Sequence, residues 1–406
     1  MPQQKGTGKY ITFCILDEVF VGNRFEQLEE YVLTVMSKER TGRKADVIRG
    51  VLRVMSWLFG VGVRSRLFLY KHGICRPNDL GVQVISIGNV TAGGTGKTPV
   101  CEVFARALQN EGRKVAILSR GYRSVKPPLR ERIMQKLNLL ELAPPRVVSD
   151  GRRLLLNSDL AGDEPFMLAS NLPEVAVVVD RDRVKAGRYA IKKFGCDTLI
   201  LDDGFQYLRL RHRLDIMLID CKNPFGYERL LPRGLLREPV RSVKRAGFIF
   251  ITKCPPEGAP QELKDRLRAL NPHAEISECR HHSKYIQNLY SKEQFPLEKL
   301  RGMKVAAISA IAVPESFERE LERLGAELVY KERRADHHRY TQQEIIEFVN
   351  KSAEAGAEAI LTTEKDAVRF PFLERRDLTC YFLRVQIEML SGEEAFRQWI
   401  KRICFQ

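Results

Sequence analysis

The residues with the clearest chemistry lie in VISIGNVTAGGTGKTP, residues 84–99, where an apolar run leads into a glycine-rich turn. The run predicts a buried strand and the residues after the turn predict a helix. Backbone N–H groups of such a turn can surround a phosphate at the positive end of the helix. Lys97 would bridge the β- and γ-phosphates and the Thr98 hydroxyl would bind Mg²⁺. The predicted nucleotide-binding residues are Ala92, Gly93, Gly94, Thr95, Gly96, Lys97 and Thr98.

This turn departs from the general phosphate-loop pattern, because Thr91 stands where that pattern has glycine. The sequence AGGTGKT instead resembles the variant loop with paired glycines found in one branch of P-loop ATPases. The alternative is a glycine-rich turn that binds nothing. The coincidence of a strand, Gly-Lys-Thr and a helix favours binding of ATP with Mg²⁺.

A second pattern, CDTLILDDGFQ, brings Asp202 and Asp203 to the end of a predicted buried strand. This is where a Walker-B carboxylate holds Mg²⁺ or its water. Adjacent acids after a strand also form ordinary turns. The neighbouring phosphate loop favours a metal-binding role for both.

Two further patterns could supply a base that accepts a proton from a hydroxyl acceptor. AGDEP, residues 161–165, predicts a short loop that carries Asp163, and ADHHRYT, residues 335–341, carries His337. A carboxylate can act as the base, and a histidine paired with it could orient it and tune its pKa. The alternatives are a solvated acid and a surface or capping histidine. Zinc is not expected, because the histidines lack partners at suitable spacing.

Arginine-rich segments at SRGYR (119–123), RDR (181–183) and RLLPRGLLREP (229–239) suit phosphate groups, because guanidinium makes paired hydrogen bonds to them. A single arginine is otherwise most often part of a surface ion pair. The predicted substrate-binding residues are Asn89, Arg120, Tyr122, Arg183, Gln206, Arg233 and Arg237.

The composition favours anionic partners. Lys and Arg number 67 against 51 Asp and Glu, a net charge of +16, in a chain of 406 residues, a length typical of two domains or more. The nine cysteines are scattered without a C-x-x-C pair, which indicates a reducing compartment. Residues 1–24 lack the features of a cleavable signal, so we expect a catalytic body that faces the cytoplasm.

Residues 43–76 predict one or two basic amphipathic helices. The uninterrupted apolar run Val54–Val63 is shorter than the roughly 20 residues that a spanning helix needs. A helix that lies in the membrane interface fits better. The alternative is a helix whose apolar face docks on the protein core with its arginines solvated. The Trp57-Leu58-Phe59 cluster beside these cations favours the membrane.

The elements that must position these motifs follow a β-α alternation that begins at Gly81, which is typical of a parallel sheet. We predict an α/β fold: a P-loop NTPase-type parallel sheet flanked by helices, a second smaller α/β domain and an N-terminal basic amphipathic helix. A further helix is expected near 129–142. The predicted division is an extension of unknown role (1–45), a membrane-associating helix region (46–76), a P-loop kinase core (77–300) and a C-terminal domain that contributes the His loop (301–406).

Together, eight motifs resemble the tetraacyldisaccharide 4'-kinase family, the lipid A 4'-kinases of Gram-negative bacteria, from about Trp57 to Phe370. They are GNVTAGGTGKTP, SRGYR, AGDEP, RDR, LDDGFQ, PRGLLREP, ADHHRYT and TTEKDAVRF, in the family's order. The resemblance implies transfer of the ATP γ-phosphate to the 4'-hydroxyl of a tetraacyldisaccharide 1-phosphate, with Mg²⁺ as cofactor. Residue by residue, it assigns Asp163 as the base, His337 as its partner, Asp202 and Asp203 as the Mg²⁺-associated pair, and Lys97 and Thr98 as phosphate-loop ligands.

The resemblance also implies a peripheral protein on the cytoplasmic face of the bacterial inner membrane. Its partners would be the lipid disaccharide and the anionic membrane surface. Nucleic acid is not expected, and no obligate protein partner is inferred. Residues 1–45 and the segment between Tyr122 and Asp150 are longer than the family pattern, which leaves the acyl-chain preference open.

Two other functions stay open at this point. One is a kinase for a different phosphorylated sugar, in which the basic helix only packs on the core. The other is a switch ATPase of the paired-glycine branch that binds a partner protein or DNA. The switch ATPase leaves AGDEP and ADHHRYT without a role.

Overall fold

The computed structural model describes residues 34–36, 41–121, 143–336, 338–372 and 377–405, and these form two compact units. The first unit comprises Met1–Cys75, Val90–Gly93 and Asn223–Ser242, and the second comprises Arg76–Asn89, Gly94–Lys222 and Val243–Gln406. The predicted four-part division stays a prediction, because these units group segments by contact and not by order along the chain. The helix expected near 129–142 lies outside the described residues.

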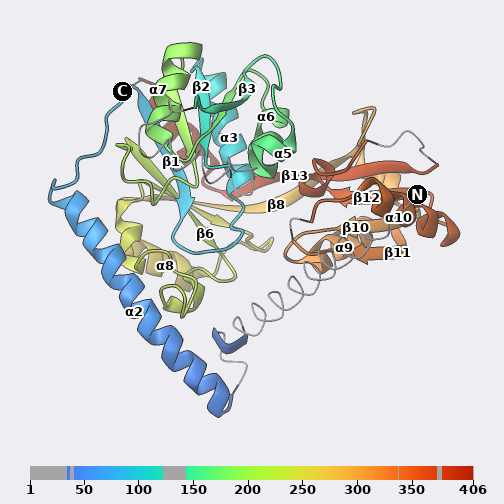
Figure 1. The fold of residues 1–406 in the computed structure, drawn as a ribbon, viewed down its shortest axis with the longest axis horizontal. Helices are drawn as coiled ribbons and strands as arrows, with labels where there is room; N and C mark the ends of the chain where they lie inside the picture. Colours follow the sequence, from blue (N-terminus) through green and yellow to red (C-terminus); the bar gives the residue numbers. More distant parts are fainter. Residues whose placement is uncertain (1–33, 37–40, 122–142, 337, 373–376, 406) are drawn as a thin grey trace, which may run out of the picture. The chain divides into compact units, whose positions relative to one another are not determined.

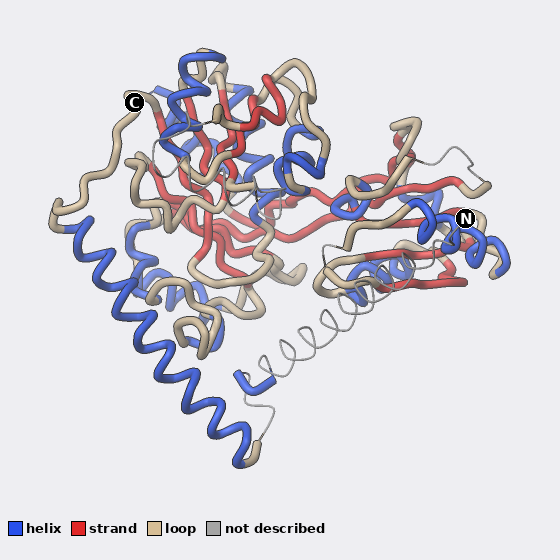
Figure 2. The backbone as a smooth tube through the Cα atoms, in the orientation of Figure 1, coloured by secondary structure: helices blue, strands red, loops and turns tan. Residues whose placement is uncertain are grey.

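The strands of the second unit form one 13-stranded sheet (Figures 1 and 2). Its order is β11-β10-β12-β13-β8-β7-β6-β1-β5-β2-β4-β3, with β9 paired to β8. The strands are β1 (Gln83–Asn89), β2 (Val115–Ser119), β3 (Arg146–Asp150), β4 (Ala176–Val179), β5 (Thr198–Asp202), β6 (Leu214–Asp220), β7 (Phe248–Thr252), β8 (Glu275–Asn288), β9 (Gln294–Phe295), β10 (Lys304–Ser309), β11 (Glu327–Arg333), β12 (Ala359–Thr363) and β13 (Thr379–Ser391). The predicted α/β fold with a largely parallel sheet is confirmed.

Two long strands join the N-terminal and C-terminal parts of this sheet. The start of β8 pairs in parallel with β7, the start of β13 pairs in parallel with β12, and the two strands pair antiparallel with each other. The sequence analysis predicted strands in both parts but neither of these connecting strands. The expected second α/β domain therefore shares one continuous sheet with the phosphate-loop part.

Helices cover both faces of the phosphate-loop part. Side chains of α3 (Lys97–Asn110), α6 (Asp163–Asn171) and α12 (Glu393–Phe405) share one apolar core with alternate residues of the central strands. The residues between them in sequence point to the other face and pack on α7 (Arg183–Phe194). This alternation is what a buried sheet requires.

The C-terminal part repeats the arrangement. Phe348 of α10 (Gln342–Glu354) packs on one face of β10, β12 and β13, and Phe317 of α9 (Pro314–Arg323) packs on the other. The remaining elements are the short helices α5 (Ser158–Ala161) and α11 (Glu364–Ala367), helix α8 (Gln261–Leu270), and the 3₁₀ turns η1 (Gly226–Glu228), η2 (Val240–Arg245) and η3 (Leu297–Leu300). Helix α11 contacts both α6 and β13, so it lies where the two parts of the sheet meet.

The segment 43–76, where one or two helices were expected, contains the single long helix α2 (Arg43–Lys71), which belongs to the first unit. Gly60 and Ser56 face the loop near Leu230, whose carbonyl accepts a 2.8 Å hydrogen bond from the Ser56 hydroxyl. Large apolar side chains elsewhere on α2 are exposed, Trp57 by 64% and Leu58 by 58%. Within the described chain, no helix combines the length and the apolar character needed to cross a bilayer.

Candidate active site

The predicted phosphate loop follows β1 and ends where α3 begins at Lys97. Gly96 precedes the helix in the left-handed region, with φ of 79°. A Cβ there would lie 2.8 Å from Nε2 of His281, so only glycine fits without strain. The Thr252 hydroxyl at the end of β7 donates to the Thr95 carbonyl at 2.9 Å and ties the loop to the sheet. Ala92 and Gly93 belong to the first unit, where the Ala92 N–H donates to the Leu235 carbonyl.

The ends of β1 and β5 approach each other closely. A Cβ on Gly88 would lie 2.7 Å from Cβ of Phe205, which explains a glycine at this point of the first motif. The Gly204 N–H donates to the Ile87 carbonyl at 3.0 Å. This contact sets LDDGFQ directly beside the strand that leads into the loop.

Asp202 and Asp203 stand at that strand end. Asp202 is buried and its Oδ2 accepts a 3.0 Å hydrogen bond from the Ser119 hydroxyl. Burial raises the pKa of Asp202 to about 6, and the nearby carboxylates of Glu164 and Asp203 add to the rise while Lys97 opposes it. The Nζ of Lys97 lies 3.6 Å from Oδ1 of Asp203. The carboxylates of Asp202, Asp203 and Glu164 therefore lie close to one another, with Lys97 beside them.

A group of carboxylates such as this fits a divalent cation. Thr98 is buried at the start of α3 and supplies a hydroxyl, and oxygen ligands are what Mg²⁺ prefers. In the described part of the chain, no cluster of three or more His, Cys, Asp or Glu side chains could hold a metal by itself. Mg²⁺ usually binds through one or two carboxylates together with substrate phosphates, which suits this arrangement.

A pocket of about 480 Å³ opens next to the loop, entirely within the second unit. Its walls come from the loop and the start of α3, from α6, from α9 and α11, and from β8 and β13. The lining residues include Gly94–Pro99, Asp163, Glu164, His281, Phe317, Lys365 and Leu383. The lining therefore combines the phosphate loop and charged side chains with apolar side chains such as Phe317 and Leu383.

Asp163 lines this pocket as the first residue of α6, and not within a loop as AGDEP predicted. Gly162 allows the turn into the helix because its φ is 89°, a value that favours glycine. The Asp163 side chain is buried and pairs with Arg369 at 2.9 Å, while Arg339 lies 3.5 Å away. His337, its predicted partner, lies outside the described residues.

The matches to known proteins agree with these features. The family model described as tetraacyldisaccharide-1-P 4'-kinase matches residues 48–404. The chain belongs to this family. A tetraacyldisaccharide 4'-kinase of Halothermothrix orenii is 34% identical over 91% of this chain and 96% of its own length. One from Geobacter sulfurreducens is 38% identical over 87% of this chain and 94% of its own length.

A solved structure supports the fold of this family member. An LpxK from Aquifex aeolicus, solved in complex with ATP, superposes with a TM-score of 0.68 at 28% identity and covers 88% of this chain and all of that chain. Family membership confirms the resemblance and the prediction of an ATP-dependent kinase.

Four of the seven predicted substrate-binding residues of this tetraacyldisaccharide-1-P 4'-kinase family member lie near Asp202. Gln206 donates from its side-chain amide to the Asn89 carbonyl at 2.8 Å, and Arg183 donates to the Asp202 carbonyl at 3.4 Å. Burial lowers the pKa of the Arg183 guanidinium, and the positive charge of Arg120 lowers it further. Tyr122 lies outside the described residues.

The other two belong to the first unit. The Arg237 N–H donates to the Val90 carbonyl at 2.7 Å. Arg233 donates to the Met36 carbonyl at 3.4 Å. Burial lowers the pKa of Arg233, and the cations of Arg229, Arg49 and Arg53 lower it further. The first unit therefore carries a concentration of positive charge.

The sequence analysis of this family member missed two buried arginines near the pocket. Arg369 lies in TTEKDAVRF, a motif used only for the resemblance, and its partner is Asp163. Arg384 of β13 joins Glu102 of α3 to Glu364 of α11. A signal existed for Arg369, since it is the arginine of a family motif. No pattern pointed to Arg384.

Proposed function

We propose that this chain transfers the γ-phosphate of ATP to the 4'-hydroxyl of a tetraacyldisaccharide 1-phosphate, with Asp163 as the base and His337 as its partner. One observation carries the proposal: the phosphate loop and the buried carboxylate of Asp163 line the same pocket. The identity of the acceptor is inferred from the family and from the activity named for its relatives.

In the proposed reaction the loop amides and Lys97 hold the β- and γ-phosphates against the start of α3. The 4'-hydroxyl oxygen forms a bond to the γ-phosphorus as the bond to the ADP oxygen breaks. The hydroxyl proton passes to Asp163, whose side chain is buried and held. Most of the rate then comes from positioning and from stabilising negative charge.

Thr98, Asp202 and Asp203 would hold the Mg²⁺. The ion supplies charge neutralisation on the β- and γ-phosphate oxygens when bound. The raised pKa of Asp202 supports this Mg²⁺ site. The rise reflects burial first and then repulsion from the neighbouring carboxylates. A cation beside Asp202 would relieve that repulsion.

We further propose that α2 lies on the anionic cytoplasmic face of the inner membrane. Among its described side chains, Val54, Met55, Trp57 and Leu58 are each more than half exposed. This exposure argues against the alternative in which the apolar face docks on the core. Exposed apolar and basic side chains on one helix are typical of interfacial binding.

The decisive assay incubates the full chain with γ-labelled ATP, Mg²⁺ and a tetraacyldisaccharide 1-phosphate in mixed micelles. Label should appear on the lipid at the 4' position, and Asp163→Ala should lower kcat by about 10²–10⁴-fold while ATP binding stays within a few-fold. Label on a soluble sugar phosphate but not on the lipid would instead favour a different sugar kinase. Slow phosphate release with no labelled acceptor would favour a switch ATPase.

A further inference from the structure

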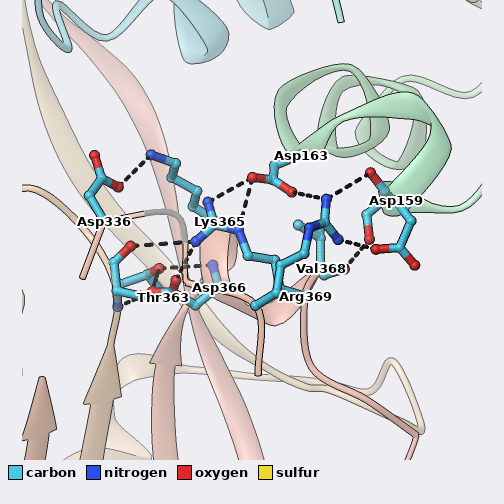
Figure 3. A network of polar contacts seen from close by, with 11 residues as sticks. Asp159, Asp163, Asp336, Thr363, Lys365, Asp366, Val368 and Arg369 are labelled. Carbon is cyan, nitrogen blue, oxygen red and sulfur yellow. Dashed lines mark hydrogen bonds and ion pairs between the residues drawn. The ribbon is translucent and has the colours of Figure 1, made fainter. Parts of the chain in front are cut away.

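Arg369 is buried and lies between the carboxylates of Asp163 and Asp366, of which Asp163 lines the pocket (Figure 3). Its Nε and Nη2 each lie 2.9 Å from Oδ2 of Asp163, and its Nη1 lies 3.0 Å from Oδ1 of Asp366. The Nη1 also donates to the Ala310 carbonyl at 3.4 Å. All three nitrogens of the guanidinium are therefore engaged, which only arginine's planar fork allows.

Asp366 is itself fixed on its other side. Its Oδ2 accepts hydrogen bonds from the Thr363 hydroxyl at 2.6 Å and the Ala310 N–H at 3.0 Å. The Asp366 N–H donates back to the Thr363 hydroxyl at 3.1 Å, so Thr363 caps the short helix α11. The position of Arg369 is therefore determined by the C-terminal part of the sheet.

Asp163 comes from the phosphate-loop part, 206 positions earlier in the chain than Arg369. Both near contacts from Arg369 reach the same oxygen of Asp163, Oδ2. The other oxygen, Oδ1, lies 3.5 Å from Nη2 of Arg339, and Asp163 lines the pocket. The ion pair with Arg369 thus fixes the position of Oδ2 of the Asp163 carboxylate.

A purely stabilising ion pair would explain burial but not this geometry. Arg384 shows what such a pair looks like in the same unit: it joins Glu102 and Glu364 across α3, β13 and α11 without touching Asp163. Arg369 instead contacts the one acidic side chain to which the proposed chemistry assigns the proton. Small displacements of a reacting group cost rate steeply, so a fixed carboxylate is valuable here.

We infer that Arg369, anchored by Asp366, is a positioning residue that orients the Asp163 carboxylate toward the acceptor hydroxyl. The inference rests on the proposed role of Asp163 as the base. It gives the TTEKDAVRF motif a function: the C-terminal part of the sheet sets the geometry of a base that the phosphate-loop part carries.

A double-mutant cycle on the full chain tests this, with Arg369→Lys, Asp163→Asn and the double variant assayed on ATP and lipid acceptor. Lysine keeps the charge but has one nitrogen in place of three, so it cannot reproduce the separate contacts of Arg369 with Asp163 and Asp366. Arg369→Lys should lower kcat 10–100-fold with KM for ATP within 3-fold, and it should cause no further loss in the Asp163→Asn background. Asp366→Asn, which leaves Asp163 untouched, should show the same pattern with a smaller loss and serves if Arg369→Lys does not fold.

Arg384→Lys is the matched control for loss of a buried arginine pair, and its effect on kcat should be equal with and without Asp163→Asn. Equal losses from Arg369→Lys in both backgrounds would overturn the inference, as would an unchanged kcat in Arg369→Lys while Asp163→Asn is crippled. If Asp163→Asn itself retains near-normal kcat, the proposed base fails and the inference fails with it.

Discussion

The Nζ of Lys97 lies 3.6 Å from Oδ1 of Asp203, so the phosphate-loop lysine already faces a predicted metal-binding carboxylate. Lys97 is largely buried at the pocket wall, where its charge is worth more than in water. We predict that Lys97→Met lowers kcat/KM for ATP by about 10²–10³-fold, the usual cost of removing one charge-stabilising group.

Steady-state kinetics at saturating lipid acceptor check this value. Lys264→Met is a suitable control, because Lys264 pairs with Glu278 and does not line the pocket. Activity of Lys97→Met within 3-fold of the parent protein would contradict the assignment of Lys97 to the phosphates.

Asp202 should cost the metal-free protein stability at neutral pH. Burial raises its pKa to about 6 from the ordinary 3.8, so protonation stabilises the folded state below pH 3.8 and that stabilisation is lost as the pH rises through 6. Asp202→Asn should therefore unfold at a higher urea concentration than the parent at pH 8. Its free energy of unfolding should be greater by up to roughly 3 kcal/mol at pH 8, with little difference near pH 4.

The same variant should lose Mg²⁺-dependent phosphoryl transfer, because an amide is a weaker ligand than a carboxylate. Urea titrations in EDTA at pH 4, 6 and 8, beside kinetics over a range of Mg²⁺, measure both effects. A variant less stable than the parent at pH 8 would show that the surroundings of Asp202 do not destabilise its charged carboxylate.

Membrane binding should depend on the exposed apolar side chains of α2. Burial of Trp57 and Leu58 in the lipid interface contributes about 1.5–3 kcal/mol each, so Trp57→Glu/Leu58→Glu should weaken binding to anionic phospholipid vesicles at least 10-fold. Vesicle sedimentation measures this. Val313→Glu, an exposed apolar position of the second unit, should leave binding unchanged. Equal binding by the α2 variant and the parent would rule out the interfacial role.

The sequence was sufficient for the elements whose signal is local. The phosphate loop, α3 and the strand that ends at Asp202 each combine an apolar run with a short motif, and the structure has them where they were expected. The long strand β8, EISECRHHSKYIQN, has no continuous apolar run, because several of its side chains are exposed and β9 and β13 complete its pairing. Such a strand is defined by its partners and not by its own residues.

The residues of the candidate site also divide into those with a local sequence signal and those defined by distant contacts. Lys97 and Asp202 were predicted because each ends or begins a local element. Asp163 was expected in a loop, since a four-residue helix and a glycine turn precede α6 and blur its start. The contact between Asp163 and Arg369 joins residues 206 positions apart, which no spacing rule in a single sequence reveals.

Arg384 should matter for stability more than any surface pair. It is buried on β13 and contacts Glu102 of α3 and Glu364 of α11, and Asn171 donates to the same Glu364 oxygen at 2.7 Å. Burial raises the pKa of Glu364, and the Arg384 guanidinium opposes the rise. Arg384→Met removes the guanidinium paired with Glu364 and leaves Glu102 with the more exposed Arg106 as its partner, and it should cost about 3–5 kcal/mol at pH 8.

Because Glu364 has a raised pKa, the loss should shrink at lower pH, where the unpaired acid can take up a proton. Urea unfolding of the parent, Arg384→Met and Arg384→Met/Glu364→Gln at pH 5 and pH 8 measures this, and the added amide should recover part of the stability at pH 8. An exposed pair such as Arg397 with Glu393 is the control, and Arg397→Met should change stability by less than about 1 kcal/mol. A loss that small for Arg384→Met would mean that the contact between Arg384 of β13 and Glu102 contributes little to holding α3 in place.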